Sequence, residues 1–409
     1  MKGPAPKPRT GRRVILFIDQ SSELGGGQRM LLDLLPALGG SYTPVVCLPG
    51  PGPLASELER SGIRWEPLAV GSYGSGSKSK ADLLRYALRQ PGLAVGLGKL
   101  AEATGAALIY ANGPRVFACS SWVARRLGLP LIWHLHLELR LTRDRHLVSA
   151  AAHLGRPAII ACSHACLVPF PARGIVRRSA EVIYNGVAPV EWRSLQAVSS
   201  SRPRAAAFAG AQPGGCATAP LIGVVGRLHP DKGQADVLRS APEVLRVFPG
   251  ARFRFVGAAQ DQRYARRLHQ QAAALGSNRV EFLAPANEPA AALAGLDVLA
   301  VPSHREAAGR VIMEAFSAGI PVVAADAGGI PEVIDPGSNG LLFRCGDERE
   351  LARALLQVLS DENLRRALIR GGRDSYQRRW RVERFRSEVL RKIGSQIGPR
   401  TRCPPAPAQ

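Results

Sequence analysis

The feature that most constrains the fold is a regular alternation of short apolar segments with longer amphipathic ones. In the first half of the chain several of the apolar segments are strand-length and hydrophobic throughout, not only at every second residue. Strands of that kind occur in parallel sheets whose two faces are both covered by helices. The expected strands are 14–19, 44–48, 107–112, 129–135, 158–163 and 181–187, and the expected helices are 28–38, 54–61, 80–103, 115–127 and 146–154.

The same alternation restarts after residue 220. The expected strands are 221–225, 252–257, 280–283, 297–302, 321–325 and 341–343, and the expected helices are 233–248, 262–275, 310–318 and 348–359. Repeated strand–helix units predict a doubly wound parallel sheet in each half, so the fold class is α/β. A last helix, 376–393, is predicted from an apolar stripe at Val382, Phe385, Val389 and Ile393.

A chain of 409 residues is longer than one hydrophobic core usually covers, so two domains are expected. Between the two series of strands, the segment 191–220 is rich in Ser, Ala, Gly and Pro and lacks periodicity, which is typical of a linker without regular structure. The predicted organisation is a basic tail 1–13, an N-terminal domain 14–190, the linker 191–220, a C-terminal domain 221–375, a helix 376–395 and a tail 396–409.

The charge balance limits the classes of partner that the chain is expected to bind. Lys and Arg number 54 against 32 acidic residues, for a net charge of +22, which favours nucleic acid, anionic lipid or phosphorylated small molecules. A solvated basic surface is the alternative reading. Aromatic residues are only 6% and no nucleic-acid-binding module is recognised, so nucleic acid is not expected.

The sequence also predicts where the protein is located. No apolar run approaches the roughly 18 residues of a membrane span, and no signal-peptide core follows the basic start. The seven scattered Cys suggest reduced thiols, so we expect a soluble cytoplasmic protein.

Ligands of open α/β sheets bind at the carboxyl ends of strands, and the first candidate there is the glycine-rich loop 25–29. Glycines let a backbone approach a ligand closely, and the N–H groups of a helix start favour phosphate. The spacing fits neither a P-loop nor a dinucleotide fingerprint, and a plain flexible turn remains the alternative.

The second candidate is the loop 226–233, which carries Arg227 and Lys232 after an expected strand. A guanidinium with paired donors and an ammonium with a point charge together suit a diphosphate. The alternative is two exposed basic residues on a turn.

The third candidate is a pair of acids, Glu306 and Glu314, with seven residues between them at the start of an expected helix. Near Arg227 and Lys232, two carboxylates can accept hydrogen bonds from sugar or ribose hydroxyls. Another glycine-rich loop, with Gly328 and Gly329, follows the next strand.

The fourth candidate is the pair His134 and His136, which strand periodicity places on one face. A hydrogen bond from one of them to a polar substrate is favoured over a metal site, because no third ligand stands out. Cys162 and Cys166 lack a second ligand pair at metal-site spacing, so structural cysteines are expected.

Three of these motifs, together with an N-G-V segment, resemble the retaining glycosyltransferases of family 4, which have the GT-B architecture of two tandem Rossmann-like domains with a C-terminal helix crossing back. The motifs are the G-R-L-x-P-x-K-G loop at 226–233, the two glutamates, the glycine-rich loop at 25–27 and the N-G-V segment at 185–187. The resemblance covers most of residues 12–393 and is strongest over 221–343.

The resemblance implies a role for each of these residues. Arg227 and Lys232 would bind the donor diphosphate and stabilise it as leaving group, Glu306 would contact hydroxyls of the transferred sugar, and Glu314 the ribose. His136 would lie near the reacting sugar, with His134 as the alternative. Backbone groups near a set of four glycines would line the phosphates and the sugar: Gly26, Gly27, Gly328 and Gly329. Ala307 and Ala308 replace the Gly or Pro and the Phe common in the family, which could enlarge the donor-sugar pocket.

The implied function is retaining transfer of a hexose from a UDP- or GDP-type sugar to a glycan or lipid-linked acceptor in cell-envelope or polysaccharide synthesis. No cofactor and no metal are expected, because the sequence has no Asp-x-Asp. A nucleotide-sugar epimerase or a phosphorylase of the same architecture is the alternative, and a polyanion-binding protein is a weaker one. The basic segments 1–13 and 365–392 predict peripheral contact with the anionic inner face of the plasma membrane.

Overall fold

The computed structural model of the chain describes residues 11–70, 80–139, 141–190, 219–276, 278–286 and 288–398. Most of the predicted basic tail, linker and C-terminal tail therefore lies outside the described residues. The chain divides into two compact units. The first comprises 1–162, 166–183 and 385–409, and the second comprises 163–165 and 184–384.

The first unit is built on a parallel sheet with the strand order β3-β2-β1-β4-β5-β6-β7 among the described residues. The order reverses between the neighbours β1 and β4, so the connections leave from opposite sides of this point. The strands are β1 (Arg13–Asp19), β2 (Tyr42–Leu48), β3 (Arg64–Pro67), β4 (Ala106–Asn112), β5 (Leu131–Leu135), β6 (Ala158–Ala161) and β7 (Ala180–Val182).

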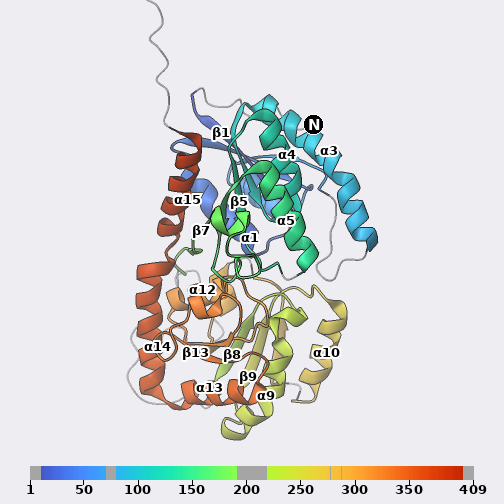
Figure 1. Cartoon of the computed structure of the whole chain (residues 1–409). Helices are drawn as coiled ribbons and strands as arrows, with labels where there is room; N and C mark the ends of the chain where they lie inside the picture. Colours follow the sequence, from blue (N-terminus) through green and yellow to red (C-terminus); the bar gives the residue numbers. More distant parts are fainter. Residues whose placement is uncertain are drawn as a thin grey trace, which may run out of the picture. The chain divides into compact units, whose positions relative to one another are not determined.

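Helices cover both faces of this sheet, as its apolar strands predict (Figure 1). On one face α1 (Gly26–Leu38), α2 (Pro53–Arg60) and the later part of α15 (Val382–Ile397) share a core with β1 and β4. The other helices of the unit are α3 (Lys80–Thr104), α4 (Phe117–Leu127), α5 (Thr142–Gly155) and α6 (Ile175–Arg178), of which α3, α4 and α5 lie together in Figure 1.

The second unit repeats the plan, with the strand order β10-β9-β8-β11-β12-β13 and a reversal between β8 and β11. Its strands are β8 (Leu221–Val225), β9 (Arg252–Val256), β10 (Val280–Leu283), β11 (Val298–Val301), β12 (Val322–Asp326) and β13 (Leu341–Arg344). One face packs against α9 (Gln234–Val247), α10 (Gln262–Ala273) and α13 (Glu348–Ser360), and the other against α11 (Pro289–Leu293) and α12 (Arg310–Ala318) (Figure 1).

The C-terminal segment differs in part from the expectation. The predicted stripe is confirmed, because Val382, Phe385, Val389 and Ile393 are all buried. The single helix expected at 376–393 is instead a π-helix, Tyr376–Trp380, followed by α15.

The helix α14 (Glu362–Ser375) was not predicted from its polar, glycine-containing sequence. Its glycines have a packing reason, because a Cβ on Gly371 would overlap the carbonyl oxygen of Ser338 and one on Gly372 would lie 2.9 Å from the ring of Phe316. Among the residues that the structure describes, no helix has both the length and the hydropathy to span a membrane.

Candidate functional site

Three loops meet at the carboxyl edge of the second sheet, where the strand order reverses. They follow β8, β11 and β12 and contain the predicted motifs. The main-chain N–H groups of His304 and Arg305 donate to the carbonyl of Asp231, at 2.9 and 3.2 Å. The N–H of Gly329 donates to the carbonyl of Glu306 at 2.8 Å. Backbone hydrogen bonds thus hold all three loops together.

Lys232 and Glu306, distant in sequence, are partners at this edge. The Lys232 Nζ lies 2.5 Å from Glu306 Oε2, and about a fifth or less of either side chain is exposed. Burial by itself would raise the pKa of the Glu306 carboxyl, but the Lys232 ammonium, the Gly309 N–H and the Arg227 charge outweigh it and lower that pKa below its usual value. Glu306 is therefore an ionised acceptor at neutral pH.

Arg227 is exposed beside this pair, and a buried side chain of α9 hydrogen-bonds its main chain. Its guanidinium donates to the side chain of Gln260. Its carbonyl accepts a 2.8 Å hydrogen bond from Nε2 of Gln234, a fully buried residue at the start of α9. The loop is thus fixed while the guanidinium stays accessible to an anion.

Glu314 lies in α12 and is nearly buried, at 8% exposure. The Nε of Arg310, one turn earlier, donates to its Oε1 at 2.8 Å. The helix begins after Gly309, whose φ of 59° lies in the left-handed region. The two glutamates therefore lie on either side of a helix start, and each is paired with a basic side chain.

Asp236 joins the β8 and β11 loops, and sequence reasoning missed it. Its Oδ2 lies 2.6 Å from Nε2 of His304, and its Oδ1 accepts from Arg239 at 2.5 Å. Only 2% of the Asp236 side chain is exposed. The only signal in the sequence is an acid in the first turn of a helix, which more often faces solvent.

Gly328 and Gly329 have a structural role that is independent of any ligand. A Cβ on Gly328 would overlap the carbonyl oxygen of Glu306, and one on Gly329 would overlap that of Ala307. Gly328 also has a φ of 56°. These glycines let the β12 loop pack directly on the β11 loop that carries Glu306.

A second set of polar groups lies at the carboxyl edge of the first sheet, again at the reversal. His136 follows β5, and its Nε2 lies 2.6 Å from Oδ1 of Asn112, the last residue of β4. The Nδ2 of Asn112 donates to Oδ2 of Asp19, the last residue of β1. Gly27 packs on the His136 ring, because a Cβ there would lie 3.1 Å from its Cδ2. Gly26 has open space at the equivalent point.

The predicted histidine pair is thereby resolved into two environments. The rings of His134 and His136 are 3.8 Å apart, as expected for one face of a strand. His134 is 2% exposed, and its Nδ1 lies 2.7 Å from the hydroxyl of Tyr110. Burial lowers the pKa of His136 to about 3, and burial followed by the neighbouring ring lowers the pKa of His134 well below its usual value. Both rings are neutral near pH 7, and His136 is the more accessible.

No group of three His, Cys, Asp or Glu residues that could hold a metal ion occurs in the described ranges. Cys162 and Cys166 are buried with their Sγ atoms 3.6 Å apart.

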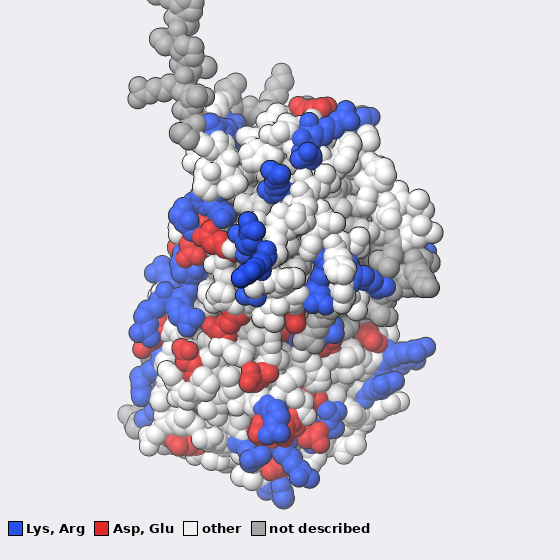
Figure 2. Space-filling model, viewed as in Figure 1, with Lys and Arg blue, Asp and Glu red and all other residues white. Residues whose placement is uncertain are grey.

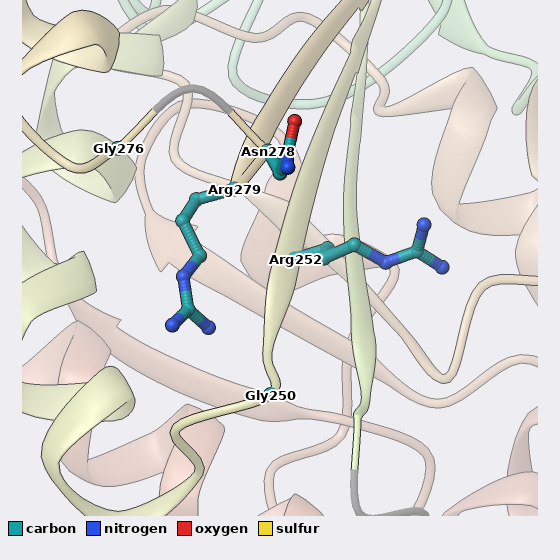
Figure 3. Close-up of a pocket in the computed structure, with 5 residues that line it drawn as sticks. All are labelled: Gly250, Arg252, Gly276, Asn278 and Arg279. Carbon is teal, nitrogen blue, oxygen red and sulfur yellow. The ribbon is translucent and has the colours of Figure 1, made fainter.

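A shallow pocket at the amino ends of β9 and β10 lies at the opposite edge of the second sheet from the β8 loop. It is lined by Gly250, Arg252, Gly276, Asn278 and Arg279. Figure 3 shows the guanidinium groups of its two arginines pointing away from each other, so they do not converge on one anion.

Family models match both halves of the chain. The model described as glycosyltransferase family 4 matches residues 24–191, and the model described as glycosyl transferases group 1 matches residues 214–375. The chain belongs to the family 4 glycosyltransferases. This confirms the resemblance drawn from the motifs and, with the two sheets, the GT-B fold.

Individual relatives carry more specific names. The chain is 32% identical over 281 residues to a D-inositol 3-phosphate glycosyltransferase of Saccharomonospora viridis, and the match spans 64% of each chain. A GDP-mannose-dependent monoacylated alpha-(1-6)-phosphatidylinositol monomannoside mannosyltransferase of Corynebacterium glutamicum is 32% identical over 41% of this chain and 45% of its own.

A solved structure resembles nearly the whole chain. HepE of Anabaena, in complex with UDP and glucose, is 27% identical, with a TM-score of 0.77 over 93% of this chain and 98% of that chain. In this chain Lys232, Glu306 and Glu314 fall in the group 1 match, and His136 and Gly27 fall in the family 4 match.

Proposed function

We propose that the chain transfers a sugar, with retention of anomeric configuration, from a nucleoside diphosphate sugar to a hydroxyl of a glycan or lipid-linked acceptor. The observation that carries the proposal is the cluster of Arg227, Lys232 and Glu306 at the sheet reversal of the second unit. It sets two cations, for a diphosphate, beside an ionised carboxylate, for sugar hydroxyls.

The chemistry follows from where charge develops. Breaking the anomeric C–O bond leaves negative charge on the departing diphosphate, and Arg227 and Lys232 stabilise that charge electrostatically, usually the largest catalytic contribution. Glu306 accepts hydrogen bonds from hydroxyls of the transferred sugar, and Glu314 from the ribose. The acceptor attacks from the face of the leaving group, whose phosphate oxygen takes the acceptor's proton. No metal is part of this scheme.

The donor is proposed to be of UDP or GDP type. The relatives support this class, since HepE is described with UDP and glucose and the Corynebacterium relative is named for GDP-mannose. Ala308 stands where the much larger Phe is common in the family, which favours a roomy sugar pocket. The names of the relatives support a polyhydroxylated or lipid-linked acceptor.

A thermal-shift panel of UDP, GDP and ADP with their common sugars tests the donor site. A ligand that binds the native state raises the melting temperature in proportion to the logarithm of its excess over Kd. We expect one base to stabilise the wild type, and Lys232→Ala to lose the effect. The control is Arg267→Ala, which removes one positive charge from the exposed side of α10. No shift with any nucleotide would contradict the proposal.

The reaction itself is tested by product analysis with the donor that the panel selects. We expect a glycoside whose anomeric configuration, measured by proton NMR, equals that of the donor. Isomerised donor without transfer would indicate an epimerase, and cleavage that requires inorganic phosphate would indicate a phosphorylase. EDTA should leave the rate unchanged.

We also propose peripheral binding to the anionic inner face of the plasma membrane. Arg and Lys side chains occupy the exposed sides of α14 and α15 (Figure 2), although Glu181 pairs with both Arg391 and Lys392. Flotation with anionic and neutral vesicles tests the proposal. Recovery with the anionic vesicles alone is expected, and equal recovery with both would contradict it.

A further inference from the structure

Asn112 occupies the centre of a buried hydrogen-bond chain in the first unit. Its Nδ2 donates to Oδ2 of Asp19 at 2.5 Å and to the carbonyl of Gly27 at 3.3 Å. Its Oδ1 lies 2.6 Å from Nε2 of His136. Asp19 and Asn112 are at most 1% exposed, so water cannot substitute for these partners.

The acceptors around Asn112 fix which way its amide points. Oδ1 of Asp19 accepts from the N–H of Ser21 at 2.9 Å and from Nε2 of Gln28 at 2.8 Å. Every hydrogen-bond partner of this carboxylate among the described residues is a donor, and the Gly27 carbonyl carries no hydrogen. The end of the Asn112 side chain that faces Asp19 and Gly27 must therefore be the NH₂ group.

The orientation of the Asn112 amide in turn fixes the proton on His136. With the NH₂ group turned to Asp19, the carbonyl oxygen of the Asn112 side chain faces the imidazole. An oxygen acceptor at 2.6 Å requires a hydrogen on Nε2. In a neutral ring Nδ1 then carries a lone pair and no hydrogen.

We propose that Asp19 and Asn112 are positioning residues that hold His136 in its Nε2–H tautomer, so that Nδ1 is the acceptor offered to a hydroxyl of a sugar substrate. The tautomer follows from this chain's own contacts, and the hydroxyl rests on the proposed function. Burial keeps the ring neutral, since it lowers the pKa of His136 to about 3. Burying a carboxylate costs stability, so a buried network of this kind is best explained by what it orients.

The neighbouring histidine offers an internal control. His134 contacts the Tyr110 hydroxyl through Nδ1, and its Nε2 has no hydrogen-bond partner in the part of the chain that the structure describes. Asn112 makes its hydrogen bonds to Asp19, Gly27 and His136 instead. Changes to Asp19 or Asn112 should therefore alter the nitrogen shifts of His136 and leave those of His134 nearly unchanged, whereas Tyr110→Phe should do the reverse.

The test is a long-range proton–nitrogen correlation spectrum of protein with labelled histidine, near neutral pH, which distinguishes the two tautomers. The wild type should show His136 protonated on Nε2. Asp19→Asn should reverse this tautomer, although residue 19 does not contact the ring. The new NH₂ group at position 19 faces the NH₂ group of Asn112, and two donors cannot form a hydrogen bond with each other. The Asn112 amide then turns over and presents its NH₂ group to Nε2, which moves the hydrogen to Nδ1.

Exchanging the Asp and Asn side chains between positions 19 and 112 should restore the wild-type tautomer. In Asp19→Asn with Asn112→Asp, the residue-19 oxygen still accepts from Ser21 and Gln28, and its NH₂ group donates to the new carboxylate. That carboxylate accepts from Nε2–H, so the tautomer returns. With the donor that supports transfer, kcat should fall about tenfold or more in the single variant, with a smaller change in KM, and recover in the double variant, as the loss of one positioned hydrogen bond implies.

The positioning role of Asp19 and Asn112 and the proposed function can be contradicted by separate results. A wild-type spectrum with the hydrogen on Nδ1, or an unchanged tautomer in Asp19→Asn, would overturn the positioning role whether or not the chain transfers sugar. The wild-type measurement needs no variant to fold. Absence of transfer with every donor would count against the proposed function and leave the tautomer result standing. A reversed tautomer with unchanged kcat would overturn the assignment of Nδ1 to a substrate hydroxyl.

Discussion

The two sheets reverse their strand order at corresponding points, yet the polar groups at the two edges are held by different forces. In the first unit Asp19, Asn112 and His136 form a buried hydrogen-bond chain that ends in a neutral ring. In the second unit Lys232 and Glu306 form a partly exposed ion pair beside the Arg227 guanidinium. The first edge is suited to orienting a hydroxyl, and the second to holding an anion.

The difference shows that topology selects the place and strand-end residues select the chemistry. At both edges the loops after the neighbouring strands β1 and β4, or β8 and β11, converge because the connections diverge on either side of them. The predictions below test whether one edge responds to charge and the other to hydrogen-bond direction and fit.

The largest effect is expected for Lys232→Ala. The substitution removes a charge from the diphosphate site and leaves the carboxylate of Glu306 without its closest cation. By analogy with the loss of one preorganised donor, kcat/KM for the donor should fall by about 10² to 10³. Steady-state transfer assays measure this, with Arg267→Ala as the charge-matched control. A loss no larger than that of the control would mean that the second edge does not act through charge.

The next effect is a pH dependence of stability at the first edge. Burial raises the pKa of Asp19 from its ordinary 3.8 to about 6, against the opposing hydrogen bonds from Asn112 and Gln28. Because the folded-state pKa is the higher, the stability that this carboxyl contributes is fully present below about pH 4 and is lost as the pH rises through 6.

Asp19→Asn removes that dependence. Between about pH 4 and pH 7 the free energy of unfolding of the wild type should fall by about 2 kcal/mol relative to the variant. Denaturant titrations of both proteins at several pH values measure this free energy. It is taken from the unfolding transition whose midpoint the substitution changes. A constant difference between the two proteins would mean that Asp19 does not titrate in this range.

A smaller effect is expected for Gly27→Ala. The added Cβ would lie 3.1 Å from Cδ2 of His136, so the ring must move by a few tenths of an ångström. Misplacement of this size should lower kcat about tenfold, with little change in melting temperature. Gly26→Ala adds the same atom to open space. A loss of donor affinity in that variant would therefore indicate a clash with bound phosphate and not with the protein. Equal activity of Gly27→Ala and wild type would show that the fit to His136 is not needed.

The smallest effect is that of salt. Raising the ionic strength from about 0.05 to about 0.5 M shortens the screening length severalfold, so UDP affinity at the exposed Arg227 should fall severalfold. The tautomer of His136 should not change, since its partners are buried. Isothermal titration and the NMR spectrum measure the two responses on one sample. Salt-independent UDP binding would contradict the electrostatic character of the second edge.

The second edge was largely predictable from the sequence, and the first only in part, through His136 and Gly27. Arg227, Lys232, Glu306 and Glu314 lie in short, strongly patterned segments, and strand-end geometry brings such segments together. The pairing of Lys232 with Glu306 could not be predicted, because side-chain contacts across 74 residues depend on the packing of both loops.

The first edge left a weaker signal in the sequence. The predicted strands 14–19 and 107–112 end on Asp19 and Asn112, each a polar residue closing an apolar run. Many strands end on a polar residue that faces solvent, so the pattern alone does not distinguish a network. Only the register of β1 against β4, which pairs Asp19 with Asn112, makes the two residues neighbours.

The most direct test of the central claim compares the nucleoside diphosphate selected by the thermal-shift panel with its monophosphate, by isothermal titration on wild type and Lys232→Ala. If Arg227 and Lys232 bind the diphosphate, the wild type should prefer it by at least about tenfold, the value of one charge-assisted hydrogen bond. Lys232→Ala should lose most of that preference while binding the monophosphate almost as well. An equal preference in both proteins would contradict the account, because the anion would then be bound elsewhere.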